Sequence, residues 1–127
     1  MLNLKVPIIS VLLSNGASGG ALALAVSDYL IAIEDSYLSI ISPYACLEII
    51  NKEFSDLNDV KGFLKCDCNE LYKLGIVDHI IRKKSGTFNE SDVVLNLKRI
   101  IYNKIIKNQK ICFKKRIKLR KKKYDNY

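Results

Sequence analysis

The residues best suited to chemistry lie in one glycine-rich stretch near the start of the chain, residues 14–25. This stretch follows an unbroken apolar run and leads directly into an alanine-rich segment with helical propensity. Glycines allow positive φ angles and let a ligand approach the backbone closely. A helix that begins there points its free N–H groups and the positive end of its dipole at that ligand. The pattern therefore predicts an oxyanion site built from backbone.

Two other interpretations of the same stretch remain open. A strand, a glycine-rich turn and a helix N-terminus also describe loops that bind nucleotide phosphates. The chain has neither a Gly-x-Gly-x-x-Gly nor a Gly-Lys-Ser/Thr motif, which disfavours phosphate binding. The second alternative is a tight turn in an ordinary βα unit, with no ligand at all.

Cysteine and histidine are the other candidates for chemistry, and neither forms a recognisable site. Cys66 and Cys68 are separated by one residue, and no cysteine or histidine spacing matches a structural zinc site. We therefore predict no metal in this chain and expect reduced, buried or half-buried thiols. His79 is the only histidine. With no catalytic-type neighbour in sequence, it is expected on a strand surface and not as a base.

The net charge is +8 and is concentrated in the last part of the chain, Lys110 to Lys123. Such a run usually forms a solvated face or a frayed end, and contact with an acidic partner or nucleic acid is the alternative. Nucleic acid is disfavoured because no stacking aromatics interleave with the charges. No apolar run approaches the roughly 18 residues of a membrane span, and the first 13 residues do not resemble a signal peptide. A cytoplasmic protein is expected.

The elements expected around the glycine-rich stretch are those of an α/β protein. The run Val6–Leu13 lacks polar alternation and predicts a strand covered on both faces, as in parallel sheets. Ser42 and Pro43 predict the start of a helix. Asp67 and Glu70 resemble a capping box for a short helix that ends at Gly75. The other elements are expected at residues 19–26 (helix), 29–33, 37–41 and 76–81 (strands), 42–53 and from 55 (helices).

The C-terminal part is expected to be helical after a polar loop at residues 83–90. Apolar residues recur at helical spacing from Ser91 to Ile105 and predict a long amphipathic helix. The basic tail is expected to continue this helix and to contribute mainly solubility or contact with an acidic partner. Removal of the residues after Lys110 would then leave the fold intact.

In order along the chain, three blocks resemble the carboxyltransferase alpha subunit of bacterial-type (and plastid-type) acetyl-CoA carboxylase. These are Gly16-Ala17-Ser18-Gly19-Gly20-Ala21-Leu22-Ala23-Leu24, Tyr37-Leu38-Ser39-Ile40-Ile41-Ser42-Pro43, and the block from Leu64-Lys65 to Leu74-Gly75-Ile76-Val77-Asp78. The resemblance covers only the C-terminal part of the family's chain. It implies a partial crotonase-like (ClpP/crotonase) core of ββα turns at residues 1–82, a loop at 83–90, and a C-terminal helix with a basic tail at 91–127.

The resemblance also implies an activity, in which a carboxyl group moves from carboxybiotin on a carrier protein to acetyl-CoA to form malonyl-CoA. The backbone amides of Gly19 and Gly20 would be the oxyanion donors, and Gly16 and Ser18 would contact the substrate. The implied partners are a carboxyltransferase beta-type subunit, the biotin carboxyl carrier protein and biotin carboxylase, in a hetero-oligomer within fatty acid biosynthesis. The implied compartment is the cytoplasm, or the plastid stroma.

The chain departs from the family pattern beside these motifs. It has Ser14-Asn15-Gly16 where the family has Gly-Glu-Gly, and Tyr44-Ala45 where the family has Glu-Gly. Two further hypotheses therefore stand beside the enzyme subunit. One is a catalytically inert remnant that serves as an assembly or binding piece, and the other is a different crotonase-superfamily enzyme that acts on another acyl-CoA.

Overall fold

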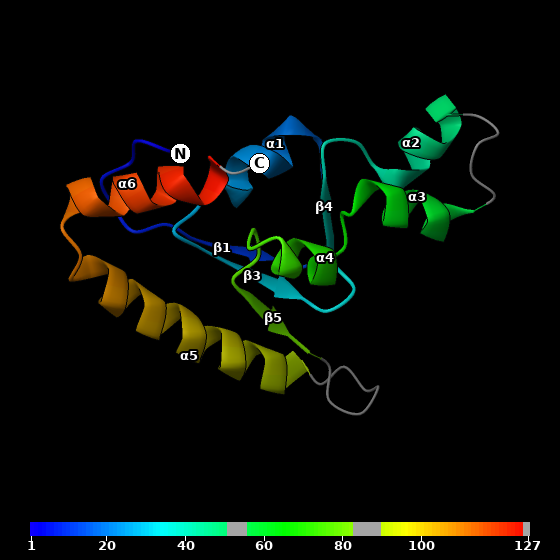
Figure 1. Ribbon diagram of the computed structural model, residues 1–127. Coiled ribbons are helices and arrows are strands. Elements are labelled where there is room, and N and C mark those ends of the chain that lie inside the picture. The colour runs from blue at the N-terminus through cyan, green and yellow to red at the C-terminus, as the bar shows by residue number, and fades with distance from the viewer. Residues whose placement is uncertain (51–55, 83–89, 126–127) are drawn as a thin grey trace.

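The computed structural model describes residues 1–50, 56–82 and 90–125 (Figure 1). These residues form five strands and six helices. In chain order they are β1 (Ile9–Leu12), β2 (Asn15–Ala17), α1 (Ser18–Ala25), β3 (Tyr29–Ile33), β4 (Tyr37–Ser39), α2 (Pro43–Ile50), α3 (Leu57–Leu64), α4 (Cys68–Lys73), β5 (His79–Ile81), α5 (Glu90–Gln109) and α6 (Phe113–Tyr124). None of the helices in these ranges is long and apolar enough to cross a bilayer.

The strands form two small parallel sheets. One sheet has the order β1-β3-β5, and the other pairs β2 with β4. Successive strands therefore enter alternate sheets before the chain turns into a helix: β1, β2 and α1 make one such turn, and β3, β4 and α2 make the next. This repetition is the ββα spiral that was expected.

The hydrophobic core lies on both faces of β3, which explains its unbroken apolar sequence. Leu30 and Ala32 pack into a cluster with residues of α1 and α4, whereas Ile31 and Ile33 pack under α5. Alternate side chains of a strand point to opposite faces, so a strand covered on both sides needs apolar residues at every position. The predicted amphipathic stripe of α5 is confirmed, since its residues Val93, Leu97, Ile100 and Ile101 make this contact.

Strand β2 is the element that sequence patterning missed. Its residues, Asn15–Ala17, have little strand propensity, and pairing with β4 places them in a sheet, with Gly16 opposite Leu38. The strand predicted at Tyr29–Ile33 is confirmed with both its bounds. The strand predicted at 6–13 is shorter, as are those predicted at 37–41 and 76–81.

The predicted helix starts are confirmed where they are described. The amide of Ala45 donates to Ser42 Oγ at 3.1 Å, and Asp67 accepts from the amides of Asn69 and Glu70. Gly75 has φ 81°, the left-handed value expected at the end of α4. Asp56 caps α3, whereas Ser55, the predicted start, and the predicted end near Glu53 lie outside the described residues. Residues 83–89 of the predicted loop 83–90 also lie outside them, and Glu90 begins α5.

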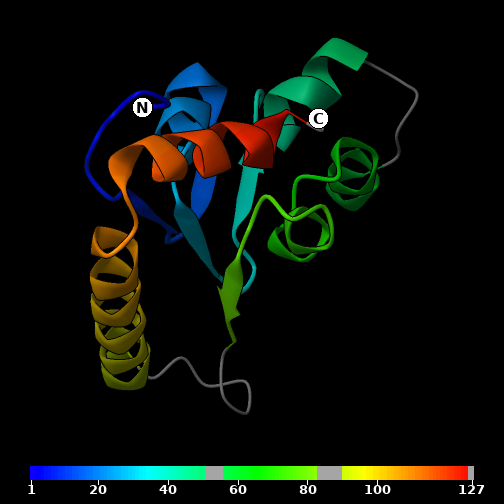
Figure 2. The ribbon, with the colours of Figure 1, turned by 60° about the vertical axis from the view of Figure 1, so that its left-hand side comes forward.

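The C-terminal tail is where the sequence-based expectation is wrong. The chain leaves α5 after Gln109 and begins a second helix, α6, which turns back to lie beside α1 (Figures 1 and 2). Two arginines of α6, Arg116 and Arg120, are buried. The tail is therefore a packed element of the fold, because its arginine side chains bind backbone and carboxylate groups far away in sequence.

Candidate functional site: the turn into helix α1

The candidate site is the turn between β2 and α1. Ser18 has a φ of 84°, so it occupies the left-handed region that L-residues rarely adopt. Gly16, Gly19 and Gly20 do not use the positive φ that glycine allows, since Gly75 is the one glycine with positive φ among the described residues. The chain therefore changes direction sharply at Ser18. The presence of glycine at positions 16, 19 and 20 must have a reason other than backbone conformation.

Gly19 and Gly20 leave open space at the start of α1. A Cβ atom built on Gly19 would meet nothing within 4 Å, and one built on Gly20 would meet only Ser18 Oγ at 3.8 Å. Packing within this chain thus does not require glycine at either position. Their lack of side chains instead leaves the backbone accessible to a group from outside the chain.

The amides of this first turn are not capped by a side chain, and the turn contains no acidic residue. The first N–H groups of a helix have no acceptor within the helix, and the helix dipole adds positive potential there. Residues 13–25 contain no ionisable side chain, so what this turn offers chemically is a set of backbone donors for a developing negative charge.

Gly16 has a different role from the glycine pair. A Cβ on Gly16 would lie 3.0 Å from Leu12 Cδ1 and 3.1 Å from Leu38 Cδ1, which is closer than side chains normally pack. Glycine at this position therefore lets β2 lie tightly against β1 and β4. Gly16 also borders an apolar cavity of about 440 Å³ beside β1 and α1. The predicted contact of Gly16 with substrate stays a prediction.

The carboxyl end of α1 is held firmly, in contrast to its open amino end. Ser10 Oγ, from β1, donates to the carbonyl oxygen of Leu24 at 2.7 Å. The Tyr124 hydroxyl, from α6, donates to the carbonyl oxygen of Ala25 at 3.0 Å and accepts from the amide of Ser27 at 3.3 Å. Two of the last carbonyls of α1 thus have side-chain donors.

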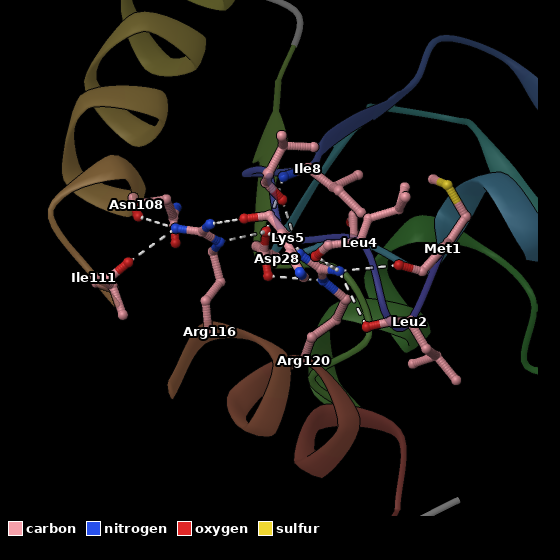
Figure 3. Close-up of polar contacts among 12 residues, drawn as sticks. Met1, Leu2, Leu4, Lys5, Ile8, Asp28, Asn108, Ile111, Arg116 and Arg120 are labelled. Atoms are coloured by element: carbon pink, nitrogen blue, oxygen red, sulfur yellow. Dashed lines mark hydrogen bonds and ion pairs between the residues drawn. The ribbon is translucent and has the colours of Figure 1, made fainter. Parts of the chain in front are cut away.

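The same face of α6 anchors the strands at their amino ends (Figure 3). Arg120 forms a two-pronged ion pair with Asp28, with Nε and Nη2 each 2.8 Å from a carboxylate oxygen. Asp28 also accepts the amide of Ile8 at 2.8 Å. Lys123 Nζ binds one carboxylate oxygen of Asp78, and the same oxygen accepts the amide of Leu30 at 2.7 Å.

The arginines also organise the N-terminal segment. Arg120 donates to the carbonyl oxygens of Met1, Leu2, Leu4 and Val6, and Arg116 to those of Lys5, Asn108 and Ile111. Every nitrogen of Arg120 has a partner, whereas Arg116 Nε has no hydrogen bond and lies 4.0 Å from Asp28. Arg116, Arg120, Lys123 and Tyr124 are called the α6 clasp below.

Comparison with known proteins identifies the family. Residues 1–127 match the family described as acetyl co-enzyme A carboxylase carboxyltransferase-like. The alpha subunit of the acetyl-coenzyme A carboxylase carboxyl transferase of Ruminiclostridium cellulolyticum is 40% identical over 98% of this chain and 47% of its own length. The subunit of the same name from Fusobacterium nucleatum is 33% identical over 87% of this chain and 36% of its own length.

The chain belongs to this carboxyltransferase family. It spans about half, or less, of the length of these relatives, as the predicted partial match requires. A crystal structure of a Pseudomonas malonate decarboxylase hetero-tetramer in complex with coenzyme A has the same fold over 80% of this chain and 41% of its own, with a TM-score of 0.61 and 18% identity. This likeness confirms the predicted crotonase-like fold.

Other candidate residues lie away from this site in the carboxyltransferase-like chain. His79 is a half-buried residue of β5 opposite Ile31, as expected of a strand residue. Cys46, Cys66 and Cys68 are buried as expected, whereas Cys112 is exposed. In the ranges that the structure describes, no group of three or more His, Cys, Asp or Glu residues is arranged to hold a metal ion.

The α6 clasp was missed by sequence analysis, although a signal was present. Its members recur at spacings of four and seven or eight residues, which places them on one face of a helix. The run Phe113–Tyr124 contains two arginines, and both are the buried ones. Arginine presents a planar fork that suits carboxylates and carbonyls, so two arginines in a run of lysines were a signal for a specific contact.

Proposed function

We propose that this chain acts as the alpha-type part of an acetyl-CoA carboxylase carboxyltransferase. In this role it helps to move a carboxyl group from carboxybiotin to acetyl-CoA, which gives malonyl-CoA for fatty acid biosynthesis. The observation that carries the proposal is the uncapped start of α1 at Gly19 and Gly20, in a chain that matches the carboxyltransferase family along its whole length.

The proposed carboxyl transfer requires hydrogen-bond donors of the kind that this turn contains. When the carboxyl group leaves the biotin ureido group, negative charge develops on the ureido oxygen. Donors fixed on a backbone and aimed at such an oxygen stabilise it without reorganisation, and removal of one such donor costs about 100- to 1,000-fold in turnover. The amides of Gly19 and Gly20 would supply these donors, and Gly16 and Ser18 would shape the approach to them.

The reaction also needs groups that residues 13–25 do not contain, since none of their side chains can ionise. A carboxyltransferase beta-type subunit would supply the site for acetyl-CoA and its enolate. A biotin carboxyl carrier protein would deliver carboxybiotin, which biotin carboxylase forms with ATP. We therefore propose a hetero-oligomeric complex in the cytoplasm, where the free cysteines of this chain stay reduced.

The proposal is tested by replacing Gly20 with valine in the complete carboxyltransferase assembly. Apart from its chain neighbours and the backbone of its own helix, a Cβ atom at Gly20 meets its nearest atom, Ser18 Oγ, at 3.8 Å, so we expect Gly20→Val to fold while blocking the approach to the amides. We expect turnover to fall by about a hundredfold or more. Gly62→Val is the matched control, because Gly62 lies in α3 and a Cβ there also meets nothing within 4 Å.

The outcomes separate the alternatives. Normal turnover in a folded Gly20→Val assembly would refute the assignment of the glycine pair. A wild-type chain that joins the assembly but supports no malonyl-CoA formation would favour the inert assembly piece. Transfer to a different acyl-CoA, with acetyl-CoA unused, would favour another enzyme of the crotonase superfamily.

A further inference from the structure

Helix α1 is too short and too rich in glycine to be stable by itself. It has eight residues, and two of its first three are glycines, each of which costs about 1 kcal/mol relative to alanine in a helix. Isolated helices of this length do not form stably in water. Contacts with the rest of the fold must therefore decide where its first turn lies.

The usual anchor at the amino end is absent. Ala17, the residue before α1, makes no side-chain capping bond, so the first amides remain available to a ligand. A capping side chain would occupy the donors that the proposed reaction uses. The amino end of α1 continues directly from β2, which pairs with β4, so side chains can hold the helix without covering these amides only along its side or at its carboxyl end.

At the carboxyl end, by contrast, side-chain hydroxyls bind the helix. The Ser10 and Tyr124 hydroxyls donate to the carbonyl oxygens of Leu24 and Ala25, and Tyr124 also accepts the amide of Ser27. Ser10 lies on β1, and Tyr124 lies on the helix whose arginine, Arg120, is fixed to Asp28. Both donors thus belong to elements that are themselves tied to the three-stranded sheet.

We infer that Ser10 and Tyr124 are positioning residues for the Gly19–Gly20 site. They act through α1, by fixing its carboxyl end and hence the place of the amides about two turns away. This inference rests on the proposed function. It adds that the last helix of the chain, which is far from the glycine pair in sequence, takes part in the geometry of the site.

The test uses Tyr124→Phe and Ser10→Ala in the full chain, each of which removes a hydroxyl and keeps most of the side-chain volume. Tyr102→Phe is the matched control, because Tyr102 lies on α5 and is 65% exposed. Two quantities are measured: hydrogen exchange of the backbone amides in the chain itself, and kcat and KM in the carboxyltransferase assembly. The hydrogen-exchange measurement does not depend on enzymatic activity.

We expect exchange of the amides in residues 18–25 to rise several-fold while that of α5 is unchanged. We expect kcat to fall about tenfold with KM within about twofold, since displacement of a reacting group by a fraction of an ångström is costly. Tyr102→Phe should change neither. A merely structural role would instead raise exchange in α1 and α5 together and leave kcat of the folded assembly unchanged.

The inference is overturned if exchange at α1 is unchanged in both variants, or if kcat is unchanged while α1 loosens. Should the wild-type assembly transfer no carboxyl group, the proposed function fails, and the exchange pattern alone decides whether Ser10 and Tyr124 hold α1.

Discussion

At the scale of single residues, burial decides the chemical character of the cysteines. Cys66 and Cys68 are 2% and 1% exposed, and burial is the main cause that raises the pKa of both thiols above the ordinary value of 9.0. Nearby acidic residues, Asp67 above all, act in the same direction. Both thiols therefore stay protonated and unreactive in the folded chain, whereas Cys112 is exposed at the start of α6.

The thiols give a prediction for alkylation. Since the thiolate is the reactive form, iodoacetamide should modify one thiol of the folded chain quickly and the other three only after unfolding. Cys112→Ser should abolish the fast phase, as measured by mass spectrometry of the intact chain. Rapid modification of Cys66 or Cys68 without denaturant would contradict the burial of these residues.

The raised pKa values of Cys66 and Cys68 also predict how the free energy of unfolding depends on pH. Above pH 9.0 the unfolded thiols ionise while the native ones keep their protons, so the native chain binds more protons and the free energy of unfolding falls as pH rises. Replacement of Cys66 and Cys68 by alanine should flatten this part of the pH profile.

At the scale of elements, α6 is held by charges that are buried inside the molecule. Arg120 and Asp28 have side-chain exposures of 0% and 4%. A buried pair contributes little net stability compared with apolar packing, but removal of one partner leaves the other charge without compensation. The exposed cations of α6 are lysines, Lys118 among them, and they lie on the opposite side of the helix from this pair.

The element-scale prediction compares Arg120→Gln with Lys118→Gln. Arg120→Gln removes the two-pronged ion pair of Asp28, which keeps the 4.0 Å contact with Arg116, and it leaves carbonyl oxygens of the N-terminal segment without donors. We therefore expect a loss of about 3–5 kcal/mol in the free energy of unfolding. Lys118→Gln should change it by less than about 0.5 kcal/mol. Urea unfolding measures both.

Truncation after Lys110 gives a second measurement of the same point. It removes the whole α6 clasp and should unfold or strongly destabilise the chain, contrary to what the sequence suggested. Equal stability of the truncated and intact chains would show that α6 is dispensable.

At the scale of the whole molecule, large apolar side chains are exposed near the edge of the three-stranded sheet. Strand β1 lies at the edge of its sheet, and Val6, Leu13 and Leu24 around it are 59–68% exposed. A second apolar cavity, of about 700 Å³, lies between α1, β4 and α4. Exposed apolar side chains and open apolar cavities of this kind favour a contact with other chains.

We therefore expect the isolated chain to self-associate and to form no malonyl-CoA without partner subunits. Sedimentation velocity over a dilution series should show large species that dissociate on dilution. Leu24→Lys should shift the distribution toward the monomer, because it places a charge on the exposed face of α1 beside β1. A wild-type monomer that unfolds cooperatively and makes malonyl-CoA alone would contradict this view.

The sequence by itself determined the parts of this protein that depend on neighbouring residues. An apolar run predicted β3, apolar residues at helical spacing predicted α5, and Ser42 and Asp67 predicted helix starts. These features follow from local propensity and short-range hydrogen bonds, which a few adjacent residues contain in full.

Only the tertiary structure decided the features that depend on distant partners. Strand β2 exists because β4 lies beside it, and Ser18, not a glycine, takes the positive φ because the chain must turn from that pairing into α1. The direction of the tail depends on Arg120 and Asp28, which are 92 residues apart. From the sequence alone, a run of basic residues is expected to be solvated. Only the fold shows that a buried carboxylate and carbonyl oxygens lie within reach of its arginines.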